Sequence, residues 1–274
     1  MTKILVTVKR IPDPDESLKF TPGGLDLSSV KWVPNAFDEY AVETALRLAE
    51  DVGNKKNRLA EIIVLSICPE KQRQHMTQFL AMGADRGVVV DADDSEFDTA
   101  SIAKIIAKVA QDEGVDLVIT GKLSQDNEGN QIGQRVAAHL GWPQACFAAE
   151  IDWDQAGNSL SVSREVDDGV ETKKVPMPAV VSVDLRVVLP TSVRNGLNPA
   201  DHKFTDGPRL ASLRGITMAK RKKVKVVKAA DLGVVNGGGE KTVAIDKPPQ
   251  RKAGQMVGSV EELVEKLATE AKVL

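Results

Sequence analysis

The sequence predicts an α/β protein with a doubly wound, mainly parallel sheet. Short apolar runs, such as residues 4–8 and 62–65, alternate with segments in which apolar residues recur at helical spacing. This alternation is typical of βαβ units, whose right-handed crossovers place helices on both faces of a parallel sheet. A chain of 274 residues is long enough to bury a large core without disulfide bonds.

The first half of the chain is expected to contain four strands and the helices that connect them. The strands are predicted over four apolar runs at residues 4–8, 62–65, 88–90 and 117–119. The first three helices are bounded by residues that favour helix starts or ends, namely Asp38 and Gly53, Pro69 and Gly83, and Asp98 and Gly114. A fourth helix is expected near residues 134–140.

The pattern changes after Trp142 and Pro143. Strands separated by turn residues are expected at residues 151–154, 160–166, 170–175 and 179–183, and they should add antiparallel strands to the sheet or to its edge. Residues 186–208 resemble a loop, and the cationic run in 218–228 is expected to be a solvated face or a surface that docks an acidic partner.

The last part of the chain predicts an extended arm that ends in a helix. It begins with a polar stretch containing Gly237, Gly238 and Gly239, and Ser259 with Glu262 forms a capping box for the terminal helix. Such an arm has little core of its own, so it is expected to pack on its own domain or on a partner chain.

The composition excludes several classes of function. Hydrophobic residues make up 42% and charged residues 27%, the net charge is −3, and aromatic residues are only 4%, so a nucleic-acid surface is not expected. Cys68 and Cys146 are too few for a disulfide framework, and the three histidines show no ligand spacing, so no metal site is expected. Without a signal region or an apolar span, we expect a cytoplasmic protein with no membrane insertion.

Residues 116–133 are the strongest candidate for a binding site, because they join a buried strand to a helix through a polar loop. Unpaired N–H groups and the dipole at a helix start bind anions. Gly121, Gly129 and Gly133 allow a ligand to approach the backbone. A sugar, base or phosphate could be hydrogen-bonded by Asp126, Asn127, Asn130 and Gln131. The loop matches neither GxGxxG nor GxxxxGK[ST], so a plain turn is the alternative to a nucleotide site.

Several motifs then occur in a fixed order. They are VKR near the start, AMGADRG from Ala81, GKxxxDxxxNQxG from Gly121, PAVVSVDLR from Pro178, PRLASLRGITMAKRKK from Pro208 and PPQRKAG from Pro248. Together they resemble the beta subunits of electron transfer flavoproteins along nearly the whole chain.

The resemblance implies a heterodimer with an alpha subunit. It also implies one FAD, held mainly by alpha, that receives electrons from flavoprotein dehydrogenases of the acyl-CoA dehydrogenase type, as in fatty acid oxidation. A downstream acceptor such as a quinone oxidoreductase takes these electrons, and the beta chain is not itself an enzyme. The Rossmann-like sheet of the beta subunit is expected to hold a structural AMP.

The residues of the AMP pocket and of the partner surfaces also follow from the resemblance. The pocket consists of Thr7, Asn35, Ala36, Phe37, Asp38, Ile67, Gly121, Lys122, Leu123, Ser124, Gln125, Asp126, Asn127, Glu128, Gly129, Asn130, Gln131 and Ile132. The loop that recognises dehydrogenases consists of Arg209, Leu210, Ala211, Ser212, Leu213, Arg214, Gly215, Ile216, Thr217 and Met218. Leu213 is expected to be its exposed anchor, and Glu165 to pair with an arginine of alpha.

Three regions are expected on this basis. Residues 1–186 form the nucleotide-binding domain, and residues 187–228 contain an insertion at 187–207, the recognition loop and the basic stretch. Residues 229–274 form an arm and helix that pack on alpha.

Three other functions are weighed. In electron-bifurcating relatives a second FAD replaces AMP, but Asn130 with Gln131 is more typical of the AMP type. A stand-alone ATP-hydrolysing or adenylating enzyme or sensor is disfavoured, because Lys9-Arg10-Ile11-Pro12 stands where a Ser-Gly-Gly phosphate loop would lie. Nucleic-acid binding would rest on the short cationic run alone.

Overall fold

The computed structural model describes residues 1–21, 24–54, 56–235, 239–240, 242–250 and 253–274. Four residues of the motifs above, Gly237, Gly238, Arg251 and Lys252, therefore lie outside the described residues. The chain divides into two compact units. The larger comprises residues 1–18 and 27–242, and the smaller comprises residues 19–26 and 243–274.

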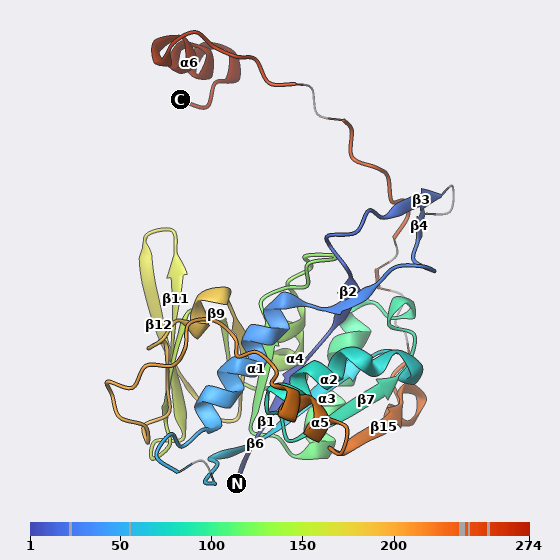
Figure 1. Cartoon of the computed structure of the whole chain (residues 1–274), viewed down its shortest axis with the longest axis vertical. Coiled ribbons are helices and arrows are strands. Elements are labelled where there is room, and N and C mark those ends of the chain that lie inside the picture. Colours follow the sequence, from blue (N-terminus) through green and yellow to red (C-terminus); the bar gives the residue numbers. More distant parts are fainter. Residues whose placement is uncertain (22–23, 55, 236–238, 241, 251–252) are drawn as a thin grey trace. The chain divides into compact units, whose positions relative to one another are not determined.

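The larger unit is built on a sheet of seven strands in the order β15-β7-β6-β1-β8-β13-β9 (Figure 1). All its neighbouring strands are parallel. The strands are β1 (Thr2–Thr7), β6 (Ala60–Ile67), β7 (Arg86–Asp91), β8 (Leu117–Gly121), β9 (Gln144–Ala148), β13 (Ala179–Val183) and β15 (Val224–Lys228). The predicted doubly wound, mainly parallel fold is confirmed.

Alternate residues of each strand enter two separate cores. Ile4 and Val6 of β1 pack on the face that holds α1 (Ala36–Ala49) and α2 (Met76–Met82), which follows a 3₁₀ turn at Glu70–His75. Leu5 points to the opposite face, which is covered by α3 (Thr99–Glu113) and α4 (Ile132–Leu140). Because both faces of a parallel strand are buried, such strands are apolar throughout rather than alternating.

A second sheet has the order β12-β11-β10-β14. It consists of β10 (Glu150–Asp154), β11 (Ser159–Val166), β12 (Gly169–Pro176) and β14 (Val193–Arg194), of which β10 to β12 are antiparallel. The predicted hairpin strands are confirmed, but they form a sheet of their own. The expectation of an antiparallel strand at 179–183 was wrong: β13 is parallel to β8 and buried in all five residues.

Other local predictions were also corrected. Asp38 does not cap α1, because its carboxylate accepts a hydrogen bond from Lys9 N–H instead, and the N-cap is Asn35. The helix ends at Ala49, before Gly53. The cationic run is only partly a solvated face, since β15 is the edge strand beside β7. Residues 186–208 are not all loop, because a 3₁₀ turn at Leu185–Val188 and β14 begin this segment.

The caps of α3 are as predicted. The Asp98 carboxylate accepts a hydrogen bond from Ser101 N–H at 2.7 Å. Gly114 ends the helix in the left-handed conformation, at φ 60°. Two further antiparallel strands, β2 (Arg10–Pro12) and β5 (Trp32–Pro34), form a ribbon after β1.

The smaller unit contains a hairpin of β3 (Lys19–Thr21) and β4 (Gly24–Asp26), and the helix α6 (Val260–Lys266), which continues as a π-helical turn over Leu267–Ala271. Half of the predicted capping box is present, because Ser259 Oγ accepts from Glu262 N–H at 3.1 Å. The Glu262 carboxylate accepts from Gly258 N–H at 2.7 Å rather than from the N–H of the N-cap residue Ser259. In the parts of the chain that are described, no helix is both long and apolar enough to cross a membrane.

Candidate functional site

A cavity of about 190 Å³ opens at the carboxyl ends of β1, β6 and β8. The chain leaves β1 toward β6 on one side and later returns to β8 on the other, so the cavity lies at the point where the strand order reverses. Open α/β sheets bind ligands at this point because the loops above neighbouring strands diverge there.

The structure brings most of the predicted pocket residues together. Those that line the cavity are Thr7, Asn35, Asp38, Ile67, Gly121, Lys122, Leu123, Ser124, Asn127, Gly129, Asn130, Gln131 and Ile132. Five others are outside its lining, namely Ala36, Phe37, Gln125, Asp126 and Glu128. Of these, Gln125 and Asp126 hold the loop in place through contacts with Ala36 and Lys9.

Sequence reasoning missed an apolar wall on the α3 side. The additional lining residues are Val8, Lys9, Leu65, Asp94, Phe97, Thr99, Ile102, Ile106 and Thr120. Gly133, which the sequence predicted as a point of close ligand approach, also lines the cavity. The apolar repeat of α3 was visible in the sequence, but only the strand order shows that Ile102 and Ile106 turn toward the cavity. An apolar wall beside a polar loop suits a flat base joined to a polar sugar and phosphate.

The polar wall is the start of α4. Its N-cap residue, Gln131, makes no capping hydrogen bond with its side chain, which instead accepts from Arg135 Nε at 2.9 Å. Gly133 permits a close approach to β8, because a Cβ there would lie 3.2 Å from Thr120 Oγ1. The N–H groups at this helix start are suited to an anion.

The Thr120 hydroxyl is a second unsatisfied group in the wall. Thr120 is 2% exposed, and its Oγ1 has no hydrogen-bond partner among the described residues. A buried polar atom without a partner is costly. Less than 1 Å² of the Oγ1 surface is accessible, so this atom is covered by protein and is not open to the cavity.

Asn35 fixes the loop above β8. Its Nδ2 donates to the Leu123 carbonyl at 3.0 Å, and its Oδ1 accepts from Gln125 N–H at 3.2 Å. The Gln125 Oε1 in turn accepts from Ala36 N–H at 3.2 Å. Both polar groups of this buried amide are therefore engaged, so Asn35 acts by positioning the loop.

Asp38 is the buried acid of the site. Burial raises the pKa of its carboxyl to about 7, although the 2.7 Å hydrogen bond from Lys9 N–H acts in the opposite direction. The unfolded chain would release this proton near pH 4. Between about pH 4 and 7 the folded state therefore binds more protons than the unfolded state, and the contribution of Asp38 to stability falls as pH rises.

We expect Asp38→Asn to remove this pH dependence. The free energy of unfolding of the wild type, minus that of the variant, should decrease from pH 5 to pH 8, because only the wild type has to bury a charged carboxylate. Urea denaturation at both pH values measures this difference. The control is Asp112→Asn, at an exposed position of α3, for which this difference should not change with pH. A difference between the wild type and the Asp38 variant that does not change with pH would contradict the prediction.

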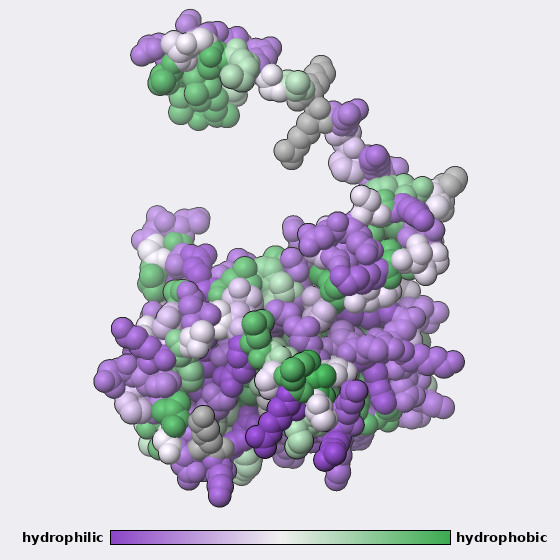
Figure 2. Space-filling view, viewed as in Figure 1, coloured by the Kyte–Doolittle hydropathy of each residue, from purple (hydrophilic) through white to green (hydrophobic). Residues whose placement is uncertain are grey.

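The predicted recognition loop is a short helix, α5 (Leu213–Ala219), with the residues before it. Ser212 Oγ accepts from Gly215 N–H at 3.0 Å and caps the helix. Leu210 is 94% and Leu213 is 85% exposed, and Figure 2 shows hydrophobic side chains among hydrophilic ones on the face where α5 lies. Exposed leucines this close together are typical of a contact surface.

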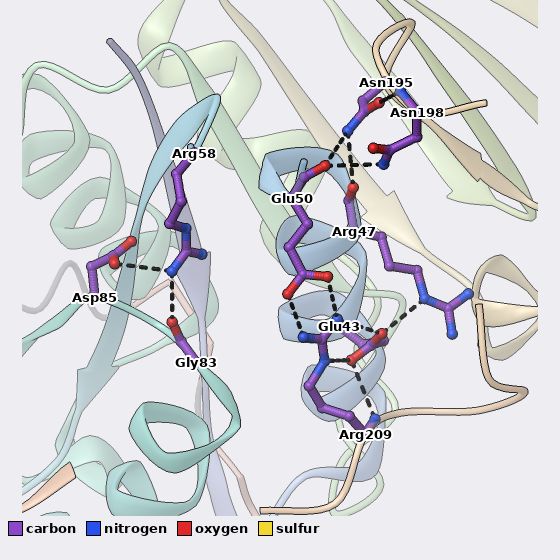
Figure 3. A network of polar contacts seen from close by, with 9 residues as sticks. All are labelled: Glu43, Arg47, Glu50, Arg58, Gly83, Asp85, Asn195, Asn198 and Arg209. Carbon is purple, nitrogen blue, oxygen red and sulfur yellow. Dashed lines mark hydrogen bonds and ion pairs between the residues drawn. The ribbon is translucent and has the colours of Figure 1, made fainter. Parts of the chain in front are cut away.

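A buried ionic network holds the base of this loop (Figure 3). Glu43 of α1 is 3% exposed and lies between two arginines: its Oε1 accepts from Arg47 Nε at 2.8 Å and its Oε2 from Arg209 Nε at 2.7 Å. Arg209 also pairs with Glu50, and these carboxylates raise its pKa although burial alone would lower it.

The same helix anchors the segment 187–207. Arg47 donates to the carbonyls of Leu189, Thr205 and Gly207 at 2.7–3.0 Å. The buried Asn195 donates to the Glu50 carbonyl at 2.8 Å, so it satisfies the free end of α1. The segment before the recognition loop is therefore fixed by hydrogen bonds to α1.

Glu165 lies at the end of β11, where it pairs with Arg186 of the same chain. Both side chains are about half exposed. A surface pair of this kind is weak and can be exchanged for another partner.

The fold and the site define a doubly wound α/β protein with a ligand pocket at the reversal of its strand order. A sequence model of the family described as "Electron transfer flavoprotein domain" matches residues 24–232. Electron transfer flavoprotein subunit beta, mitochondrial, of Arabidopsis thaliana is 40% identical over 99% of this chain and 100% of its own length. The beta subunits of Bradyrhizobium diazoefficiens and Homo sapiens are 39% and 37% identical, with 99% and 97% of this chain and 100% and 96% of their own lengths covered. The chain belongs to the electron transfer flavoprotein family, as a beta subunit.

Proposed function

We propose that this beta subunit binds AMP in the cavity above β1 and β8 and shares, with an alpha subunit, one FAD that alpha mainly holds. The pair carries electrons from flavoprotein dehydrogenases of the acyl-CoA dehydrogenase type to an acceptor such as a quinone oxidoreductase. FAD supplies the redox chemistry, and this chain contributes binding and docking. The observation that carries the nucleotide assignment is the start of α4, where the N-cap side chain makes no capping hydrogen bond and residues 131–133 line the cavity.

The charges around the cavity favour a monophosphate. Lys9 pairs with Asp126 at 2.6 Å and Lys122 with Asp184 at 3.0 Å, so both lysines in the cavity lining are already neutralised. A di- or triphosphate would require further positive charge, whereas one phosphate can be held by N–H groups at a helix start.

The test is to copurify the chain with its alpha subunit, denature the complex and quantify the released nucleotides by chromatography. One FAD and one AMP per heterodimer support the proposal. Two FAD without AMP would assign the cavity to a second flavin, as in bifurcating proteins. One FAD per heterodimer and no other adenine nucleotide would contradict the AMP assignment. ATP turnover by the isolated chain would instead favour the stand-alone enzyme.

We also propose that residues 209–218 dock the dehydrogenase through Leu213. Leu213→Ala should slow electron transfer from the dehydrogenase by about 10- to 150-fold, since burying a leucine contributes about 1.5–3 kcal/mol and each 1.4 kcal/mol is a factor of ten. Because Leu213 is exposed and does not line the cavity, FAD and AMP contents should be unchanged.

The measurement is the rate of flavin reduction by the dehydrogenase at several concentrations of the electron carrier. Val235→Ala is a matched control, because Val235 is 82% exposed and lies outside the loop. Equal rates in the Leu213 variant and the wild type would exclude Leu213 as the anchor.

The C-terminal arm is proposed to pack on alpha. Its described part exposes apolar side chains, among them Met256 at 97%, Val260 at 71% and Val264 at 50%, and Figure 2 shows a hydrophobic side on α6. Glu165 is proposed to exchange Arg186 for an arginine of alpha. The division at residues 186 and 228 and a cytoplasmic location stay predictions.

A further inference from the structure

Two residues near the end of the larger unit, Gly239 and Glu240, lie against the beginning of α3. Gly239 N–H donates to the Asp98 carboxylate at 2.7 Å, and that carboxylate also caps α3. The fit is close, since a Cβ on Gly239 would lie 3.0 Å from Asp98 Oδ2. This contact places residue 240 next to Thr99, which lines the cavity, although Glu240 itself is not in the lining.

Glu240 connects the two helices that border the cavity. Its Oε2 accepts from Thr99 Oγ1 at 3.0 Å, and its Oε1 lies 3.5 Å from Arg135 Nη2. Arg135 in turn donates to Gln131 Oε1 at 2.7 Å and 2.9 Å. Thr99 and Gln131 both line the cavity. The four side chains therefore form a continuous polar bridge from the start of α3 to the start of α4.

The bridge is exposed enough to open. The side chains of Arg135 and Glu240 are 40% and 49% exposed, so the ion pair is screened by solvent and weak. A bridge that joins two walls of a cavity makes it harder for a ligand to leave, and a weak bridge still allows exchange. Its effect should appear mainly in the rate of ligand release.

We propose that Glu240 is a positioning residue of the nucleotide pocket, which closes the rim of the cavity by bridging Thr99 and Arg135. The proposal rests on the AMP assignment made above. It adds a residue from far along the chain to a site otherwise formed by residues 7–133, and it predicts that the bridge slows the release of the nucleotide.

The test measures release of labelled AMP from the heterodimer into excess unlabelled AMP. Glu240→Ala should release AMP about three- to tenfold faster, because it loses one ion pair and one hydrogen bond. Glu240→Gln keeps an acceptor for Thr99, so its rate of AMP release should lie between the rates of the wild type and of Glu240→Ala. Glu70→Ala is the matched control: Glu70 is equally exposed at 49%, but its partner Arg73, unlike Thr99, is not among the cavity-lining residues.

Salt separates a bridge from a general loss of stability. Raising the ionic strength should accelerate release from the wild type and leave Glu240→Gln nearly unchanged, because only the wild type has a charged bridge to screen. If both proteins contain AMP and Glu240→Ala releases it at the wild-type rate, the proposed role of Glu240 is overturned, but the AMP assignment is not. A wild-type heterodimer without AMP would overturn the AMP assignment and this proposal together.

Discussion

Gly121→Ala should lower the free energy of unfolding by about 1–3 kcal/mol, as overpacking does in a dense interior, and should remove most of the bound AMP. A Cβ at this position would lie 2.6 Å from Asp38 Oδ1 and 2.8 Å from Phe37 Cβ. Neither neighbour can move freely, because Asp38 is held by Lys9 N–H and Phe37 Cβ is attached to the backbone of α1. The loop after β8 would therefore have to move away from α1.

The same loop provides a matched control. Gly129 also lines the cavity, but the nearest atom to its Cβ would be Asn127 Oδ1 at an ordinary 3.5 Å. We expect Gly129→Ala to change stability by less than about 0.5 kcal/mol. Urea denaturation and AMP content measure both variants. A Gly121 variant with wild-type stability and full AMP content would show that the contact between the loop and α1 is not required.

Glu43→Ala is expected to be more damaging, with a loss of about 3–5 kcal/mol, the usual cost of removing one partner from a buried ion pair. Arg47 is fully buried and would lose its only carboxylate partner among the ion pairs of the described residues. Arg209 would keep Glu50 alone, so the start of the recognition loop should also become more mobile. Glu43→Gln keeps the volume but only one acceptor oxygen, and its amide NH₂ would face one of the two arginines, so it should fall between the alanine variant and the wild type.

The control for this network is the pair of Lys108 and Asp112 in α3. It has the same i,i+4 spacing as Glu43 and Arg47, but its side chains are 46% and 44% exposed. Asp112→Ala should cost no more than about 0.5 kcal/mol. Chemical denaturation measures stability, and tryptic cleavage within residues 209–218 reports mobility. Equal losses in the two alanine variants would mean that burial does not determine the importance of Glu43.

Local sequence signals predicted the elements whose ends depend on nearby residues. Asp98 and Gly114 bound α3 as expected, because capping hydrogen bonds join residues only a few positions apart. Local signals failed where a group far away in the sequence forms a competing hydrogen bond or strand pairing. Asp38 has the chemistry of a cap, yet its carboxylate turns to Lys9 N–H. The polarity of Val224–Lys228 concealed an edge strand, since its pairing with β7 depends on residues more than 130 positions away.

The features of the candidate site also fall into two groups, those that the sequence predicted and those that only the fold brings together. The sequence of residues 121–133 already contained the glycines and the helix start that suit an anion, because a strand, a loop and a helix follow one another directly. The wall of α3, the locked amide of Asn35 and the bridge of Glu240 could not be predicted, since each depends on which strands are neighbours.

By itself, the sequence determined the doubly wound class, the central loop and, through its motifs, the resemblance to the beta subunits of electron transfer flavoproteins. These features depend on periodicity and on residue order, which a chain carries before it folds. The tertiary structure alone decided that β1 and β8 are adjacent, that α3 forms the apolar wall of the cavity, and that Arg209 shares Glu43 with Arg47. The physical reason is that side-chain burial and charge pairing depend on distances in space, which residues far apart in the sequence acquire only on folding.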